Sequence, residues 1–440
     1  MTEERLDRIR LGLRLHGGGG HWRDADIRPD ASIRIESYIE SAEIAEEGKY
    51  DFGFIADSSY ITEDSTWPYV SRLEPLTALS AVAARTSRLG LVGTASTSYS
   101  FPFTTARQFA SLDHISHGRA GWNAVTAALE GVARNFNGDR LHDHALRYRI
   151  AREYIDVVKG LWDSFEDDAF VRDRARNLYV DWAKMHRLNH KGEFFEVEGP
   201  LNLERPPQGH PVIFQAGASE AGRDLAARHA EAVFSTFTES DDLASGQAYY
   251  ADVKSRAVAY GRAPEDILIF PAISPIVGAT QAEADAKYER ELAWVDVGHA
   301  VKFLSRYFSF FDFSRFPLDE PLPDLGDIGA NSFKSTAEYY IRLAREEKLT
   351  LRQLAYRAAS PKGSFVGTPR AIADRMQQAF EQRAVDGFIL YVTHAQARDF
   401  NRHVLPLLRE RNLFRHEYEG TTLREHLGLR TPAHHRSNAS

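Results

Sequence analysis

Short apolar runs alternate with longer amphipathic segments along most of this chain, and this alternation restricts the folds open to it. A short apolar run bounded by turn residues is typical of a buried strand, whereas apolar residues at helical spacing indicate a helix. Regular alternation of the two favours an α/β fold built on a parallel sheet. The apolar runs predict strands at residues 9–15, 52–56, 89–93, 120–123, 212–216, 232–234, 267–276 and 388–392.

About eight strands alternating mostly with helices favour a (β/α)8 TIM barrel, with a doubly wound sheet as the alternative. At ~150 residues per domain, 440 residues suggest about three domains, but α/β barrels routinely exceed that length as one unit. We therefore expect one barrel domain over residues 1–430 and a polar tail at 431–440 that contains His434 and His435. The helices that we expect, the first capped by Ser32 or Ser37, lie at 37–47, 75–85, 104–117, 144–165, 219–229, 241–260, 281–297 and 369–384.

Two stretches, 166–211 and 301–334, exceed what a minimal barrel needs. We expect both insertions to lengthen the loops above the C-terminal ends of the strands, where sites are built in such barrels. The second contains a run of aromatic residues between Phe303 and Phe316. Two interpretations of this run stay open: an apolar lid over a pocket, or a packing segment or subunit interface.

Composition excludes several classes of protein. The chain has no Cys, so disulfides and thiolate chemistry are ruled out. Its net charge of −8 argues against a general nucleic-acid binder. The charge-rich first ten residues do not resemble a signal peptide, and no apolar stretch approaches the ~18 residues of a membrane span. We therefore expect a cytoplasmic protein with no membrane partner. No His-Glu-x-x-His or comparable ligand spacing occurs, so we expect no metal site.

Two motifs place polar side chains near predicted strand ends. The run 116–123 turns through two glycines into a strand and brings Asn123 to the strand's C-terminal end. An amide there can donate and accept, as needed to hold a heteroaromatic cofactor or a reacting oxygen, although the run could also be an ordinary turn. His144 and Tyr148 share one helical face at i,i+4 spacing, where they either contact a polar ligand or pack against a neighbour.

A third motif, residues 215–222, joins a predicted strand to a helix. Its small residues, which include Ala218, let a ligand approach the backbone. Ser219 stands at the helix N-cap, where its hydroxyl joins the free N–H groups of the first turn. Such an end suits an anion carrying one phosphate, although it is equally an ordinary cap.

Taken together and in order, several motifs resemble one known family. The chain is similar to the flavin-dependent monooxygenases for nitrilotriacetate, EDTA and dibenzothiophene sulfone, which belong to the bacterial-luciferase-like superfamily. The matching segments are 73–123, His144-x-x-Arg147-Tyr148, 189–195, 215–234, 367–369 and 386–388. The resemblance covers roughly residues 6–410, and it departs at Ser58, where the family usually has Gly, and at Ala145-Leu146.

The resemblance implies a barrel that binds FMN noncovalently and receives it reduced from a separate NAD(P)H-dependent flavin reductase. With O2 as co-substrate, one oxygen atom would enter a small organic compound and the other would leave as water. By the family pattern, Asp57 and Thr94 end the second and third strands and face the flavin, and Asn123 lies near its reactive edge. Ala218 and Ser219 would bind the phosphate side, approached by His144 and Tyr148.

For catalysis, we hypothesise that Asn123 and Thr94 orient or polarise the reacting oxygen, with His144 as a weaker candidate for proton transfer. Two alternatives remain: a deazaflavin-dependent dehydrogenase on the same barrel, and a flavin-binding protein without turnover. The resemblance also suggests a homodimer or homotetramer.

The sequence does not identify the substrate. The residues that we expect to line its pocket are His21, Trp22, Arg23, Tyr60, Trp67 and the 303–316 run. The cations in these segments are diluted by aromatic residues, which favours a neutral or singly charged, partly apolar compound. These cations are Arg23, Arg28, Lys302, Arg306 and Arg315.

Overall fold

A computed structural model of the chain describes residues 8–15, 22–24, 26–61, 65, 67–127, 129–217, 219–236, 243–308, 311–322, 334–360 and 362–434. Within these residues, eight parallel strands form a closed barrel in the order β1-β12-β9-β8-β7-β4-β3-β2. The predicted barrel is therefore confirmed, and each strand falls on an expected run. They are β1 (Arg10–Arg14), β2 (Phe52–Ile55), β3 (Gly90–Ser96), β4 (Ala120–Val125), β7 (Val212–Ala216), β8 (Ala232–Thr236), β9 (Leu268–Ile273) and β12 (Gly387–Leu390).

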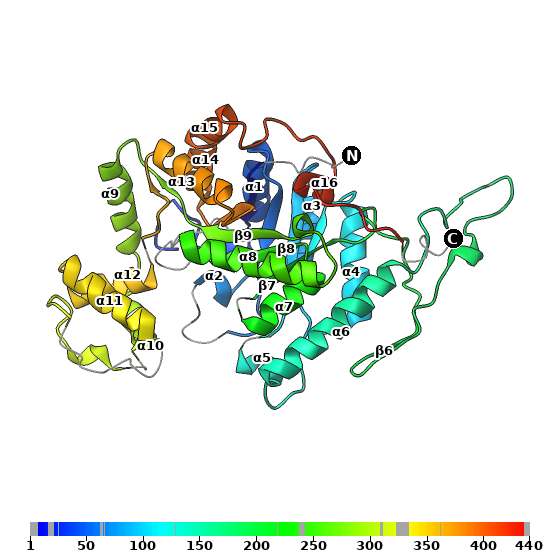
Figure 1. Ribbon diagram of the computed structural model, residues 1–440, viewed down its shortest axis with the longest axis horizontal. Coiled ribbons are helices and arrows are strands. Elements are labelled where there is room, and N and C mark those ends of the chain that lie inside the picture. Colours follow the sequence, from blue (N-terminus) through cyan, green and yellow to red (C-terminus); the bar gives the residue numbers. More distant parts are fainter. Residues whose placement is uncertain are drawn as a thin grey trace.

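Helices cover the outside of the barrel (Figure 1). One expected detail is wrong: the first helix begins after Arg34 without a side-chain cap, so neither Ser32 nor Ser37 caps it. The helices that follow the strands in turn are α1 (Ile35–Glu47), α3 (Pro75–Ala83), α4 (Pro102–Ile115), α6 (His144–Trp162), α7 (Glu220–His229), α8 (Leu243–Ala259), α13 (Pro369–Glu381) and α14 (His394–His403). Shorter helices are α2 (Trp67–Val70), α5 (Glu130–Arg134) and α15 (Leu405–Glu410).

Aromatic side chains fill the barrel interior. Phe52 packs against Phe214 and Phe270 with ring centroids 5.0 and 5.3 Å apart. Gly12 on β1 makes room for this ring, since a Cβ there would lie 2.4 Å from Phe52. The interior is thus a packed core rather than a channel, which leaves the ends of the strands as places to bind a ligand.

A short C-terminal helix, α16 (Leu423–Leu427), closes the end of the barrel where the strands begin, which we call the lower rim. Leu423 and Leu427 join the same buried cluster as the barrel phenylalanines. A Cβ on Gly90 or Gly121 would lie 2.4 or 3.1 Å from Leu423, so glycines at the strand starts admit this plug. The opposite end, where the strands finish, is the upper rim.

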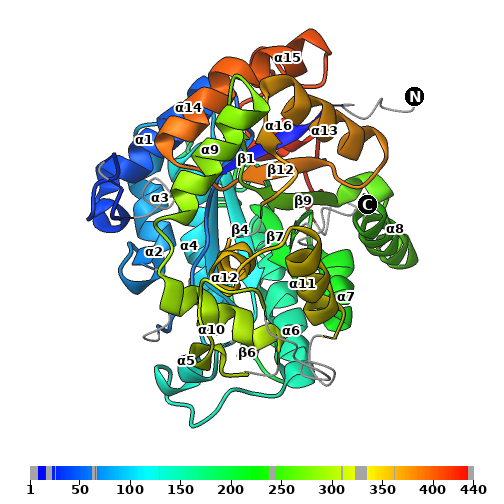
Figure 2. The same cartoon turned by 90° about the vertical axis from the view of Figure 1, so that its left-hand side faces the viewer.

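The second insertion belongs to a helical unit over the upper rim. The unit comprises α10 (Val297–Tyr307), α11 (Lys334–Glu346) and α12 (Leu351–Ala359), and it has a buried core separate from the barrel's. Phe308 and Phe313 of the aromatic run are buried in that core, so the run is a packing segment within a unit that covers this face. Figure 2 looks onto the face, with α10, α11 and α12 in front of the strands. The connecting elements are α9 (Gln281–Leu292), β10 (Ile276–Val277) and β11 (Val366–Gly367).

The first insertion, 166–211, does not lie above the C-terminal strand ends as expected. It joins the end of α6 to the start of β7, so it lies at the lower rim, on the side of the molecule opposite the helical unit (Figure 1). Arg205 anchors it by donating to Asp163, just past α6, over 2.9 Å. Within it, β5 (His190–Lys191) and β6 (Glu196–Val197) form a small hairpin.

The start of the expected polar tail also packs against this rim. The buried His434 ring contacts the Asp163 carbonyl through Nε2 at 3.0 Å, and the Pro432 carbonyl accepts from Arg205. Pro432 and His434 are therefore packed against this rim, Thr431 and Ala433 are exposed, and His435 lies outside the described residues. None of the helices in the described ranges combines the length and apolar character needed to cross a bilayer.

Candidate functional site

Thr94 and Asn123 lie side by side at the barrel mouth on the neighbouring strands β3 and β4. Asn123 donates from Nδ2 to Thr94 Oγ1 over 2.9 Å, and Thr94 in turn donates to the Ile55 carbonyl over 2.8 Å. Both side chains are buried. Within the described part of the chain, Asn123 Oδ1 has no hydrogen-bond partner. Leaving a buried acceptor unpaired costs roughly 1–3 kcal/mol, so this oxygen marks a place where a ligand donor would fit.

Most of the motif that carries Asn123 is structural. Gly118 takes a left-handed φ of 90° at the turn, as the glycine signal in the sequence predicts. The buried Arg119 donates to the carbonyls of Ala83, Thr86, Leu89 and Ser116 and to the Thr86 hydroxyl. The motif thus fastens α3, α4 and β3 together, and Asn123 is the part that faces the mouth.

A cradle for an anion lies at the start of α7, just after β7. Ser219 caps this helix by accepting from the Gly222 N–H over 3.2 Å. A Cβ on Gly222 would lie 2.9 Å from Gly217 Cα and 3.1 Å from Tyr148 Oη, so the glycines let the turn after β7 and Tyr148 approach the helix start closely. Free N–H groups and the helix dipole favour negative charge there. Ala218, expected to share this site, lies outside the described residues.

His144 and Tyr148 meet beside this cradle as their spacing predicts. Their ring centroids are 4.7 Å apart, and the Tyr148 hydroxyl reaches the first turn of α7. His144 is exposed, whereas Tyr148 is half-buried. The structure therefore brings Tyr148 and Ser219 together, with His144 at the outer edge.

The hairpin of residues 189–195 supports the helix that bears these side chains. Glu153 on α6 accepts from the backbone N–H groups of Glu193, Phe194 and Phe195 and contacts His190 Nε2 at 3.0 Å. Burial opposes ionisation of this carboxyl, but these hydrogen bonds hold the pKa of Glu153 below its usual value. The hairpin is thus bound to α6 and helps to hold this helix in place.

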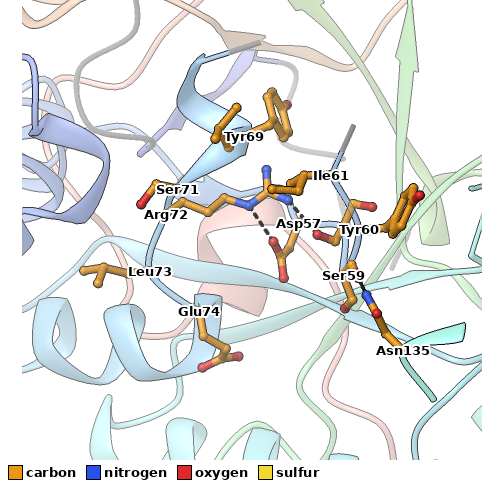
Figure 3. Close-up of a pocket in the computed structure, with 12 residues that line it drawn as sticks. Asp57, Ser59, Tyr60, Ile61, Tyr69, Ser71, Arg72, Leu73, Glu74 and Asn135 are labelled. Atoms are coloured by element: carbon orange, nitrogen blue, oxygen red, sulfur yellow. Dashed lines mark hydrogen bonds and ion pairs between the residues drawn. The ribbon is translucent and has the colours of Figure 1, made fainter. Parts of the chain in front are cut away.

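Asp57 lies in a separate pocket of about 600 Å³ beside the end of β2 (Figure 3). Arg72 donates to Asp57 Oδ1 from Nε over 2.6 Å and to the Ser58 carbonyl from Nη2 over 2.9 Å. The Arg72 side chain is only 7% exposed, and its guanidinium lies over the Tyr69 ring at 4.4 Å. Tyr60, one of the expected pocket residues, lines this pocket.

Sequence reasoning missed Arg72 and Arg14, the cationic residues of this region. Arg14 ends β1, and its guanidinium lies 4.6 Å from the Tyr391 ring and 5.1 Å from the Tyr69 ring. The sequence did contain a signal for Arg14. Side chains alternate along a strand, so Arg14 points to the same side as Gly12, which faces the barrel interior. Arg72 carried no such pattern, since it follows a short helix that the sequence did not predict.

The cations that the sequence suggested lie mostly on the surface. Arg23, Arg28, Lys302 and Arg315 are exposed, as is Trp22. His21 and the side chains of Trp67 and Arg306 lie outside what the structure describes. In the described ranges, no group of three or more His, Asp or Glu side chains is placed to hold a metal ion.

This barrel has its polar groups gathered at the upper rim. Its class of enzyme is identified by similarity to known proteins. The model of the family described as luciferase-like monooxygenase matches residues 15–387. The chain belongs to this family and is a monooxygenase, which confirms the resemblance seen in its motifs.

Individual relatives align over nearly the whole chain. N-acetyl-S-(2-succino)cysteine monooxygenase of Bacillus subtilis is 46% identical over 431 residues, 96% of this chain and 97% of the relative. Nitrilotriacetate monooxygenase component A of Aminobacter aminovorans is 44% identical, over 95% of this chain and 94% of the relative. A riboflavin lyase solved with modified FMN and riboflavin superimposes with a TM-score of 0.80 at 32% identity, over 97% of each chain.

Proposed function

We propose that the chain is the oxygenase component of a two-component, FMN-dependent monooxygenase. It takes reduced FMN from a separate NAD(P)H-dependent flavin reductase and uses O2 to oxygenate a small organic compound, with water as the other product. Two relatives support this proposal: one is named as component A of its enzyme, and the other was solved with modified FMN.

One observation carries the proposal: an unpaired amide oxygen and an anion cradle at the same rim. Asn123 Oδ1 is buried without a partner among the described residues, and Ser219 and Gly222 lie at the start of α7, beside Tyr148. The two lie on the neighbouring strands β4 and β7 or just after them. A mononucleotide has one phosphate and one ring with donors and acceptors, so it matches this donor and acceptor set.

Each of the protein's own groups then has a separate role. When bound, reduced FMN supplies the electrons that activate O2. Ser219, the first N–H groups of α7 and Tyr148 bind the phosphate, with Ala218 beside them and His144 at the edge. Asp57 and Thr94 would accept hydrogen bonds from the ring, and Asn123 with Thr94 would orient the reacting oxygen. The helical unit α10–α12 covers this rim and limits the access of water, which protects the oxygen transfer from side reactions.

The test supplies purified protein with FMN, NADH, a flavin reductase, O2 and candidate compounds. We expect product that contains oxygen from labelled O2, formed only when reductase and FMN are both present. Activity only with reduced deazaflavin would instead indicate a dehydrogenase. Flavin binding with no turnover of any compound would indicate a storage or sensing protein. Either result contradicts the proposal.

The remaining expectations extend the same proposal. We expect residues 1–430 to unfold as one cooperative domain, and the chain to form a homodimer or homotetramer in the cytoplasm. Light scattering of the purified protein measures the assembly, and calorimetry measures whether unfolding is a single transition.

A further inference from the structure

We propose that Arg14 and Arg72 form a carboxylate-binding subsite at the upper rim, so that the substrate of this enzyme is an organic anion. The inference rests on the proposed monooxygenase function and adds the chemical class of the substrate. It departs from the neutral or singly charged compound that the sequence favours, because that expectation counted cations that lie on the surface.

Arg72 supplies the first part of the subsite. It is more than nine-tenths buried and its guanidinium points to the middle of the pocket in Figure 3. Nε and Nη2 bond to Asp57 and to the Ser58 carbonyl, but Nη1 has no acceptor among the residues that the structure describes. A buried N–H group left unpaired is costly, and a charged one more so. A ligand oxygen in the pocket would satisfy it.

Arg14 supplies the second part from the end of β1, the strand that pairs with β2. Its guanidinium and that of Arg72 both lie over the ring of Tyr69, at 5.1 and 4.4 Å. A guanidinium contacts a ring through its flat face, and its N–H donors point outward in the plane. Arg14 and Arg72 thus bring two guanidinium groups to one tyrosine, and the planar donors of a guanidinium match the two oxygens of a carboxylate.

The acidic residues that line the pocket do not cancel the positive charge of Arg14 and Arg72. Asp57 is the acceptor for Arg72 Nε. The oxygens of Glu74 face away into α3, where they accept from the N–H groups of Leu76 at 3.0 Å and Thr77 at 2.7 Å. The N-terminal end of that helix carries positive potential, which offsets the charge of Glu74. Arg14 lies beside the pocket rather than in its lining, and it adds positive charge next to two described carboxylates that already have partners.

The names of two relatives are consistent with this chemistry. N-acetyl-S-(2-succino)cysteine and nitrilotriacetate, for which relatives of 46% and 44% identity are named, both carry several carboxylate groups. The pocket of about 600 Å³ has room for molecules of that size.

The experiment compares these two acids with their fully methylated, neutral esters. Binding of each compound to the full FMN-loaded protein is measured by calorimetry, and oxygenation is measured in the complete assay. The variants are Arg14→Gln and Arg72→Gln, with Arg14→Lys to keep the charge. Arg172→Gln is the matched control, because Arg172 also lies over aromatic rings, Phe170 and Tyr179, but in the insertion at the lower rim. Thermal unfolding verifies that each variant is folded.

We expect the wild type to bind at least one acid more tightly than its ester. Each Gln variant should weaken that acid roughly 10- to 100-fold, raising KM more than it lowers kcat, while leaving the ester unchanged. Arg14→Lys should lose less, and Arg172→Gln nothing.

Three results overturn the subsite: the wild type binds neither acid, it prefers the esters, or the Gln variants weaken acid and ester equally. Oxygenation of an ester alone would overturn the subsite and leave the proposed function standing. Tight, Arg14-dependent binding of an acid without any oxygenation would support the subsite and contradict the proposed function.

Discussion

At the lower rim of the barrel, buried charges bond to one another, whereas at the upper rim several polar groups point toward space that a ligand can fill. Arg415 pairs with Asp51 below, and Arg424 donates to Glu231 over 2.6 Å. Above, Asn123 Oδ1 finds no donor and Arg72 Nη1 no acceptor among the described residues. Nε and Nη1 of Arg415 below also lack acceptors there, but that guanidinium is held by its pair with Asp51.

Residues that stabilise the fold and residues that serve function therefore lie at opposite ends of the same strands. The ion pairs below join distant segments, such as the C-terminal region and β1–β2, and losing one partner would leave a buried charge uncompensated. The groups above cost stability and gain a partner only when a ligand binds. Changes at the lower rim should therefore alter unfolding, and changes at the upper rim should alter binding and turnover.

The largest effect is expected from Arg415→Met. This change leaves the fully buried carboxylate of Asp51 without its cation, and we expect a loss of about 3–5 kcal/mol in the free energy of unfolding. Arg352→Met, which breaks the exposed pair with Asp319, should leave the free energy of unfolding nearly unchanged, because solvent screens an exposed ion pair. Urea unfolding measures both, and FMN affinity of the folded variants should not change. A loss below 1 kcal/mol for Arg415→Met would show that the lower rim does not carry stability.

A smaller, pH-dependent effect is expected from His426 in the plug helix. Burial, and then the nearby Arg415, lowers the pKa of His426 to about 4. Because the unfolded side chain titrates near 6.5, the stabilisation is complete above pH 6.5, declines as the pH falls and is lost at about pH 4. The contribution is about 3 kcal/mol. His426→Gln should flatten the unfolding free energy between pH 7 and 4, and an unchanged pH profile would argue against this assignment.

At the upper rim, Ser219→Ala should weaken FMN binding about tenfold, because it removes a hydroxyl that we place at the phosphate. Thr280→Ala is the matched control, since Thr280 caps α9 in the same way by accepting from the Glu283 N–H. Each change should cost about 1 kcal/mol of stability through its lost cap. Fluorescence titration with FMN separates the two, and equal affinities in both variants would exclude a phosphate site at Ser219.

The sequence predicted the barrel well because its strands are buried on both faces and therefore read as continuous apolar runs. The cap at Ser219, the meeting of His144 with Tyr148 and the place of Asn123 followed from local spacing and are seen in the structure. Their roles toward a flavin stay predictions.

What the sequence did not predict depends on contacts between distant segments. The pairing of Arg72 with Asp57 depends on the path of a loop, and the plug by Leu423 depends on glycines in β3 and β4. The insertion 166–211 was expected at the upper rim but lies at the lower one. Its charged composition does not show at which rim it lies, whereas its position between a helix and the next strand does.

We expect Asn123 to orient the oxygen reaction at the barrel mouth, and the ratio of product formed to NADH consumed tests this role most directly. In the complete assay with reductase, FMN and O2, we expect Asn123→Ala to keep consuming NADH while this ratio falls severalfold against the wild type, because the reduced flavin is oxidised without oxygen reaching the substrate. An unchanged ratio in the folded, FMN-binding variant would contradict the account.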